Sequence, residues 1–240
     1  MVAAGTTRMA FGTIVASPGC ISPGHASAPE MSRDDSNPRS DRKALPQCLA
    51  APQISIVGEI DADLVRSFLD QLSDAEKNAA ESDDGAIAME LTTLGGDAEL
   101  ARRMVLEIEA ARKRLKHRFL FVGKTVVYSA GATIMSAFPR ADRYLTADAT
   151  LLIHCRQLEK TIEIDGPIRA SLAKLEALKA EIEMGLRLEE TNFRSLIEGS
   201  DIDLDELLEK ALYNWYLTAE EAARRGLVNR LFDLPEAVHT

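Results

Sequence analysis

The chain has 240 residues, of which 46% are hydrophobic and 28% are charged, a balance typical of a globular protein with a sizeable core. Its formal net charge of −10 argues against nucleic acid as the main partner, because phosphate binding needs a basic surface. No apolar run reaches about eighteen residues, so no membrane-spanning helix is expected.

The three cysteines, Cys20, Cys48 and Cys155, lie far apart and lack the spacing of metal ligands. We therefore expect neither a disulfide framework nor a zinc site, and no cofactor. Dispersed cysteines in odd number favour a reducing compartment, which predicts a cytoplasmic protein.

Residues 1–50 differ from the rest of the chain, because Gly, Ser, Pro, Ala and Arg dominate and no apolar period is visible. This composition predicts a disordered N-terminal extension. A removable propeptide is one origin of such a segment, and a start codon placed too early, with Met31 as the true start, is another. The apolar stretch 9–16 between Arg8 and the Ala-Ser-Ala at 26–28 leaves a signal peptide as a third.

A single domain is expected over residues 51–240, and its N-terminal part alternates short apolar runs with amphipathic segments. The predicted strands are 54–58, 86–91, 119–123, 143–146 and 151–153. The predicted helices are one capped by Asp61 or Asp63, one over 98–115, and one that follows Ser129 and ends before Pro139. This alternation predicts an α/β fold with parallel crossovers.

The remainder of the chain is predicted to be mostly helical. A long, charged amphipathic helix is expected over 167–196 and a shorter one over 203–212. The segment 218–221, Thr-Ala-Glu-Glu, is a capping box for a last helix that Gly226 ends. A final strand is expected to begin at Leu227.

Two adjacent glycines, Gly95 and Gly96, lie between a predicted strand and a predicted helix. Paired glycines allow the backbone to approach a bound group, and a helix start offers free N–H donors. A tight turn with positive φ is the alternative. A phosphate loop is disfavoured because no Lys-Ser or Lys-Thr follows, and a dinucleotide fingerprint because a third glycine is missing.

Ser129 lies where an apolar run meets a small-residue helix. Unpaired N–H groups at such a helix start can stabilise an oxyanion, which suggests a nucleophile. An ordinary helix N-cap is the alternative. The α/β-hydrolase elbow has Gly two positions before its serine, whereas Val127 is present here. Lys124 is the nearest lysine and leaves a Ser-Lys peptidase of the signal-peptide-peptidase type open.

His154 ends a strongly apolar predicted strand, and strand ends in α/β folds are where sites collect. It is therefore the candidate general base, with a satisfied core or turn histidine as the alternative. Cys155 is a rival nucleophile. Because side chains alternate along a strand, we expect Cys155 to point away from the His154 side.

Four segments, in this order and at fitting spacing, resemble the proteolytic subunit of Clp protease over about residues 53–233. They are the Gly-Gly loop at 94–97, the Ser-Ala-Gly segment at 128–131, the Leu-Ile-His segment at 152–154, and the segment 215–222 with Gly-Leu-Val at 226–228. The resemblance implies an α/β fold of the crotonase/ClpP type, a ββα spiral with a long helical handle. It also implies a serine endopeptidase that hydrolyses unfolded polypeptides inside an oligomeric chamber.

The same resemblance assigns roles to residues of this chain. Ser129 would be the nucleophile and His154 the general base, while the backbone N–H groups of Gly96 and Ala130 would form the oxyanion hole. The neighbouring positions Gly95 and Leu94 would bind substrate. The expected partners are further copies of the chain in two stacked heptameric rings, with the helix at 167–196 between the rings, and an AAA+ unfoldase ATPase.

Two positions depart from the family pattern. Asn214 stands where the family has the acid of its triad, and an asparagine can orient an imidazole but cannot stabilise an imidazolium by charge. Either another carboxylate serves, with Asp165, Asp201 and Asp203 as candidates by position, or the chain is an impaired or inactive assembly subunit. At the second position, Leu94 replaces a loop proline.

A further alternative is an acyl-CoA hydratase or isomerase, because the crotonase fold also supports oxyanion-hole chemistry on thioesters. It is disfavoured because no paired glutamates appear in the Gly-rich loop or in the Ser129 segment to transfer protons.

Overall fold

The computed structural model describes residues 47–80, 86–163 and 165–232. The strands are β1 (Ile54–Val57), β2 (Ile87–Thr93), β3 (Phe119–Tyr128), β4 (Arg143–Thr146), β5 (Thr150–Ile153), β6 (Trp215–Thr218) and β7 (Arg230–Phe232). The α-helices are α1 (Ala62–Ala80), α2 (Ala98–Arg114), α3 (Ala130–Ser136), α4 (Ile168–Ile197), α5 (Leu204–Ala211) and α6 (Ala219–Arg224). Two 3-10 turns are η1 (Gln47–Leu49) and η2 (Arg140–Asp142).

The strands form one sheet in the order β1-β2-β3-β4-β7, and all of these neighbours are parallel. Strand β5 also runs parallel to β3, and β6 pairs with β5 in the antiparallel sense. This arrangement confirms the predicted α/β class with parallel crossovers. The strand β6 was not predicted, although its side chains alternate between buried and exposed.

Strand β3 serves two partners in succession. Its residues 121–123 pair with β4, and its residues 126–128 pair with β5. A positive φ of 57° at Thr125 marks the bend between the two halves. The predicted end of this strand at residue 123 was wrong, because Lys124 and Thr125 interrupt the apolar run, whereas the strand resumes after Thr125 and pairs with β5 from Val126. The extension carries the chain directly to Ser129.

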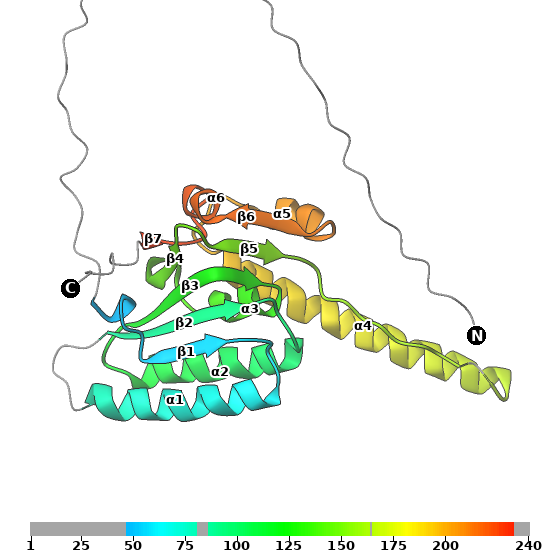
Figure 1. The fold of residues 1–240 in the computed structure, drawn as a ribbon. Coiled ribbons are helices and arrows are strands. Elements are labelled where there is room, and N and C mark those ends of the chain that lie inside the picture. The colour runs from blue at the N-terminus through cyan, green and yellow to red at the C-terminus, as the bar shows by residue number, and fades with distance from the viewer. Residues whose placement is uncertain (1–46, 81–85, 164, 233–240) are drawn as a thin grey trace, which may run out of the picture. The chain divides into compact units, whose positions relative to one another are not determined.

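Helices α1 and α2 cover one face of the sheet (Figure 1), and their apolar stripes enter the main core. Phe68 and Leu72 of α1 and Met104 and Ile108 of α2 are at most 3% exposed, as expected for the apolar faces of amphipathic helices. A smaller apolar cluster includes Leu49 and Phe232 together with strand residues. The described fold therefore begins slightly before Pro52. Of the predicted disordered extension at 1–50, residues 1–46 lie outside the described residues, whereas Gln47–Leu49 form η1 and Leu49 is buried, so the predicted boundary was slightly too late.

The predicted long helix is confirmed as α4, which extends away from the sheet (Figure 1). Only its C-terminal part is buried, at Glu189, Phe193 and Leu196. The buried guanidinium of Arg143 holds this end in place, since it donates to the carbonyl oxygen of Ser195 at 2.9 Å as well as to that of Leu196. None of the described helices is long and apolar enough to cross a membrane.

Candidate active site

Ser129 has the backbone of a strained strand-to-helix turn. Its φ is 54° and its ψ is −112°, and its side chain makes no cap hydrogen bond although it precedes α3. A positive φ is uncommon for serine and costs roughly 1–3 kcal/mol. Its backbone N–H donates to the carbonyl oxygen of Leu152 in β5 at 2.9 Å. The N-cap alternative therefore lacks its defining contact, and the hydroxyl is left for another use.

The Gly-Gly loop lies directly against Ser129. A Cβ atom on Gly95 would be 3.3 Å from the Ser129 Oγ, and a Cβ on Gly96 would be 2.5 Å from the carbonyl oxygen of Ile60. Both glycines have positive φ, 118° and 143°. Only glycine fits such positions without strain, so the tight turn and the close approach of the loop are one feature.

The N–H group of Gly96 is available to a ligand. Gly96 forms an isolated parallel bridge with Ile60, in which Ile60 N–H donates to Gly95 and Asp97 N–H donates to Ile60. In that pattern the N–H of the bridged glycine points away from Ile60. The N–H of Ala130 is at the first turn of α3, where no intrahelical acceptor exists.

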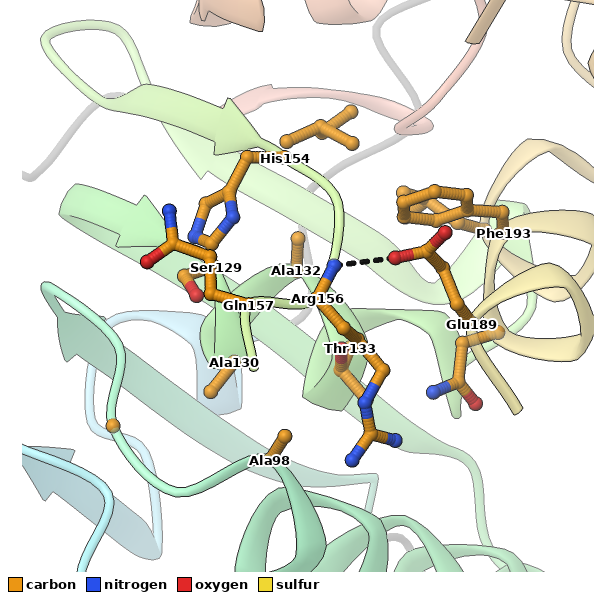
Figure 2. Close-up of a pocket in the computed structure, with 14 residues that line it drawn as sticks. Ala98, Ser129, Ala130, Ala132, Thr133, His154, Arg156, Gln157, Glu189 and Phe193 are labelled. Atoms are coloured by element: carbon orange, nitrogen blue, oxygen red, sulfur yellow. Dashed lines mark hydrogen bonds between the residues drawn. The ribbon is translucent and has the colours of Figure 1, made fainter. Parts of the chain in front are cut away.

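Ser129, Ala130, Gly96 and His154 line one pocket of about 310 Å³. Figure 2 shows the His154 ring close to Ser129, with Arg156 and Glu189 further along the same pocket. The structure thus brings together the predicted nucleophile, the predicted base and both predicted oxyanion donors. Gly95 and Leu94 line a second hollow of about 380 Å³ that shares Gly96 with the first, and Leu94 is 73% exposed.

The ring of His154 makes a hydrogen bond to the backbone. Its Nδ1 lies 2.7 Å from the carbonyl oxygen of Cys155. A carbonyl oxygen only accepts, so Nδ1 carries the proton in this contact and Nε2 is the free ring nitrogen. Within the described ranges, no hydrogen bond joins His154 to the Ser129 hydroxyl.

Asn214 directly precedes Trp215 of β6, which pairs with Ile153 of β5, and His154 directly follows Ile153. It does not line the pocket that holds His154. Its φ is 61°, a conformation that asparagine tolerates better than most residues. No side-chain hydrogen bond of Asn214 is present among the described residues, so the turn after α5 explains the residue as well as a triad does.

The three aspartates that sequence position offered as substitutes are all engaged elsewhere. Asp165 pairs with Lys174 at 2.8 Å, Asp201 pairs with Arg225 at 2.7 Å, and Asp203 caps α5. None of them lines the Ser129 pocket. The suggestion that one of them completes a triad is therefore wrong for this structure.

The rival nucleophile and the rival base are also placed elsewhere. Cys155 lines a neighbouring pocket, and burial followed by the nearby Glu189 carboxylate raises the pKa of its thiol. A raised pKa leaves little thiolate at neutral pH. Lys124 pairs with Glu90; burial opposes ionisation of that carboxyl, but hydrogen bonds from Lys124 and Ser55 outweigh it and lower its pKa. Neither residue favours Cys-based or Ser-Lys chemistry.

Two charged residues of the pocket were not singled out from the sequence, Arg156 and Glu189. The Arg156 side chain forms an ion pair with Glu99 at the start of α2. Glu189 is 5% exposed and accepts a hydrogen bond from the Arg156 backbone N–H (Figure 2). Glu189 lies in line with Phe193 and Leu196 on α4, and a charge on an apolar stripe was the available signal.

A family model described as Clp protease matches residues 39–234. The chain belongs to the Clp protease family. The ATP-dependent Clp protease proteolytic subunit 2 of Pseudomonas aeruginosa is 25% identical to it over 197 residues, which are 82% of this chain and 89% of that protein. An Asn-to-Asp mutant of ClpP1 from Listeria monocytogenes superimposes with a TM-score of 0.59 at 22% identity.

The match to the Listeria ClpP1 structure covers 79% of this chain and 96% of that one. It confirms the predicted crotonase/ClpP-like α/β fold, in which α4 is the long helix. In this Clp-family chain, the described residues contain no group of three His, Cys, Asp or Glu side chains arranged to hold a metal ion.

Proposed function

We propose that this chain is the subunit of a serine endopeptidase of the Clp type, with Ser129 as nucleophile and His154 as general base. The observation that carries the proposal is Ser129 itself. A serine held at φ 54° without a cap hydrogen bond opens onto a pocket that also contains His154. Such strain at a site is typical of a functional residue rather than of a helix cap.

The reaction that this arrangement supports is acyl transfer. His154 Nε2 takes the proton of the Ser129 hydroxyl as the oxygen attacks a peptide carbonyl, and the N–H groups of Gly96 and Ala130 hold the resulting oxyanion. The imidazolium then gives its proton to the leaving amine. Water attacks the acyl-enzyme with His154 as base, and Ser129 is released.

The two hollows give a substrate chain a path across Gly96. The exposed Leu94 side chain lines the hollow of about 380 Å³. Arg156 and Glu189 line the pocket that contains Ser129. A substrate lying over the loop would contact Leu94 and Gly95 on one side of the scissile bond. On the other side its P1 side chain would enter the pocket of about 310 Å³.

The outer part of α4 supports assembly with further copies of the chain. Its exposed large apolar side chains are Ile168, Leu172, Leu175, Ile182, Met184 and Leu186. Apolar side chains gathered on one helix are a typical interaction surface. Family membership supports four further parts of this proposal, which are stacked heptameric rings with α4 between them, an AAA+ unfoldase partner, unfolded polypeptide substrates and a cytoplasmic location.

A second candidate function is a catalytically impaired assembly subunit of the same family. Two observations favour it: among the described residues, no hydrogen bond joins Asn214 to His154, and none joins the Ser129 hydroxyl to the imidazole. Contacts of this kind often tighten only when substrate binds. A direct test is therefore needed.

Fluorophosphonate labelling tests the nucleophile directly. We expect the wild type to be labelled once per chain, and Ser129→Ala not to be labelled. His154→Ala should slow labelling by at least about 10²-fold, since it removes the base. Equal labelling of wild type and Ser129→Ala would contradict the proposal, and no labelling of either would favour the assembly subunit. Sedimentation of the same samples measures whether the chain forms rings.

A further inference from the structure

Glu189 is a buried carboxylate that the mechanism above does not use. Its exposed fraction is 5%, and it makes hydrogen bonds with the backbone N–H of Arg156 and the thiol of Cys155. No basic side chain pairs with it in the part of the chain that the structure describes. A buried carboxylate without a counterion is costly. The charge of such a group acts strongly on the polar groups that it contacts.

The peptide group between Cys155 and Arg156 connects Glu189 to His154. Its N–H donates to the Glu189 carboxylate, and its carbonyl oxygen accepts from His154 Nδ1 at 2.7 Å. Both hydrogen bonds thus belong to one planar, conjugated unit. Hydrogen bonds in such a chain polarise one another, so a negative charge at the N–H end makes the carbonyl oxygen a stronger acceptor.

We propose that Glu189 is a positioning residue that stabilises protonated His154 through the Cys155–Arg156 peptide. This role corresponds to that of the triad carboxylate, for which this chain has Asn214. When Ser129 is deprotonated, its proton moves to Nε2 of His154. The Nδ1 proton stays on the ring, and the peptide and Glu189 keep their protonation. The kinetic consequence rests on the proposed peptidase function, whereas the effect on His154 does not.

Among the described charged groups around His154, Glu189 is the one without a partner of opposite charge. The guanidinium of Arg156 is paired with Glu99 from α2, which also binds Arg102. Helix α3 presents only Ala130, Ala132 and Thr133 to the pocket. The Cys155 thiol is neutral because its pKa is raised. On the side of β6, the residues paired with the end of β5 are Trp215 and Tyr216, which carry no formal charge at neutral pH.

Glu189→Gln separates charge from shape, because glutamine keeps an acceptor for the Arg156 N–H. Glu190→Gln is the matched control, since Glu190 lies one residue away on the exposed face of α4, paired with Arg194. Both variants are made in the full chain with 13Cε1- and 13Cδ2-labelled histidine. His154→Gln assigns the His154 signals, and His117 serves as an internal reference.

We expect neutral His154 to be the Nδ1–H tautomer and its pKa to fall in Glu189→Gln, because the imidazolium loses a stabilising charge. The pKa of His117 should not move in either variant, and Glu190→Gln should leave His154 as in the wild type. An unchanged His154 titration in Glu189→Gln, or an Nε2–H tautomer in the wild type, would overturn the proposal. A lower melting temperature without a change in titration would mean a structural role only.

The kinetic arm follows the rate of Ser129 labelling by a fluorophosphonate against pH. Glu189→Gln should label roughly tenfold more slowly, equivalent to a change of about one pKa unit. Its acid limb should move to lower pH, in the same sense as the His154 pKa. If wild type is not labelled at Ser129, the peptidase function fails, while the titration still decides the role of Glu189. If labelling is normal and the His154 titration does not change, only the role of Glu189 fails.

Discussion

Gly95 and Ser129 touch so closely that a Cβ atom on Gly95 would lie 2.9 Å from the Cβ of Ser129. The loop that follows β2 and the turn that follows β3 therefore pack as one unit. Gly95 also has a φ of 118°, where a side chain is strained in any case. Both constraints act on the same few atoms beside the candidate oxyanion donors.

Gly95→Ala should accordingly reduce the reactivity of Ser129 strongly while the protein still folds. We expect labelling of Ser129 to fall by at least about 10²-fold, because a displaced loop removes an oxyanion donor. The unfolding free energy should fall by roughly 1–3 kcal/mol. Gly185→Ala in α4 is the control, since a Cβ there meets nothing within 4 Å. It should stabilise by about 0.5–1 kcal/mol and keep normal labelling.

Substitution of Asn214 tests whether it acts on His154. Asn214→Gly removes the amide and suits the φ of 61°, so it should change Ser129 labelling by no more than about twofold. Asn214→Asp places a carboxylate at the end of the β5–β6 pair that precedes His154, and it should raise the labelling rate and move the acid limb to higher pH. A loss in Asn214→Gly as large as that in His154→Ala would instead make the amide essential.

Arg156 should set the preference for the P1 residue of a peptide. Its Nη1 is buried without a hydrogen-bond partner, and a buried unpaired donor favours a ligand that supplies an acceptor. We expect peptides with P1 Gln to be cleaved better than matched peptides with P1 Leu. Arg156→Met should shift that ratio toward Leu by about tenfold. Glu99→Gln, which keeps the donor, should change the ratio less; an unchanged ratio in Arg156→Met would refute the prediction.

The acid stability of the chain should depend on Glu206. Arg225 donates to both of its oxygens at 2.9 and 2.7 Å, and Lys210 donates at 2.7 Å. The hydrogen bonds from Arg225, and then that from Lys210, lower the pKa of Glu206 from 4.5 to about 2. A folded-state pKa below the unfolded value stabilises the fold above pH 4.5, and this contribution is lost as pH falls toward about 2.

Urea unfolding of wild type and Glu206→Gln across this range measures the effect. The side chain of Glu206 is 29% exposed, so solvent screening reduces the expected difference to about 1–2 kcal/mol at neutral pH. The two proteins should converge as the pH approaches 2. A difference that is constant with pH would mean that the ion pairs with Arg225 and Lys210 contribute nothing to the dependence.

Periodicity and turn residues were enough to predict most elements and the segments that carry Ser129, His154 and Gly96. The strand β3 was cut short because Lys124 and Thr125 are polar, and only the pairing with β5 shows that the backbone continues. The strand β6 is four residues long, and no strand was predicted from the sequence for this segment before α6. Short strands depend on pairing partners that a local pattern does not contain.

The carboxylate proposed to act on His154 was the least predictable part of the candidate site. Asp165, Asp201 and Asp203 were proposed by chain position, but each carboxylate is used by an ion pair or a helix cap. Glu189 comes from α4, which reaches the pocket only because Arg143 and the core hold its C-terminal end there. A contact between distant segments of this kind follows from tertiary packing, which a spacing argument does not contain.

The positive φ at Ser129 also has a consequence for the stability of the fold. A glycine at position 129 would relieve the positive φ and should stabilise the fold by roughly 1 kcal/mol relative to alanine. The Ser129 hydroxyl does not offset this loss of stability through a cap hydrogen bond, because it makes none. Ser129 thus lowers the stability of the fold, and a subunit with a structural role alone would gain nothing from it.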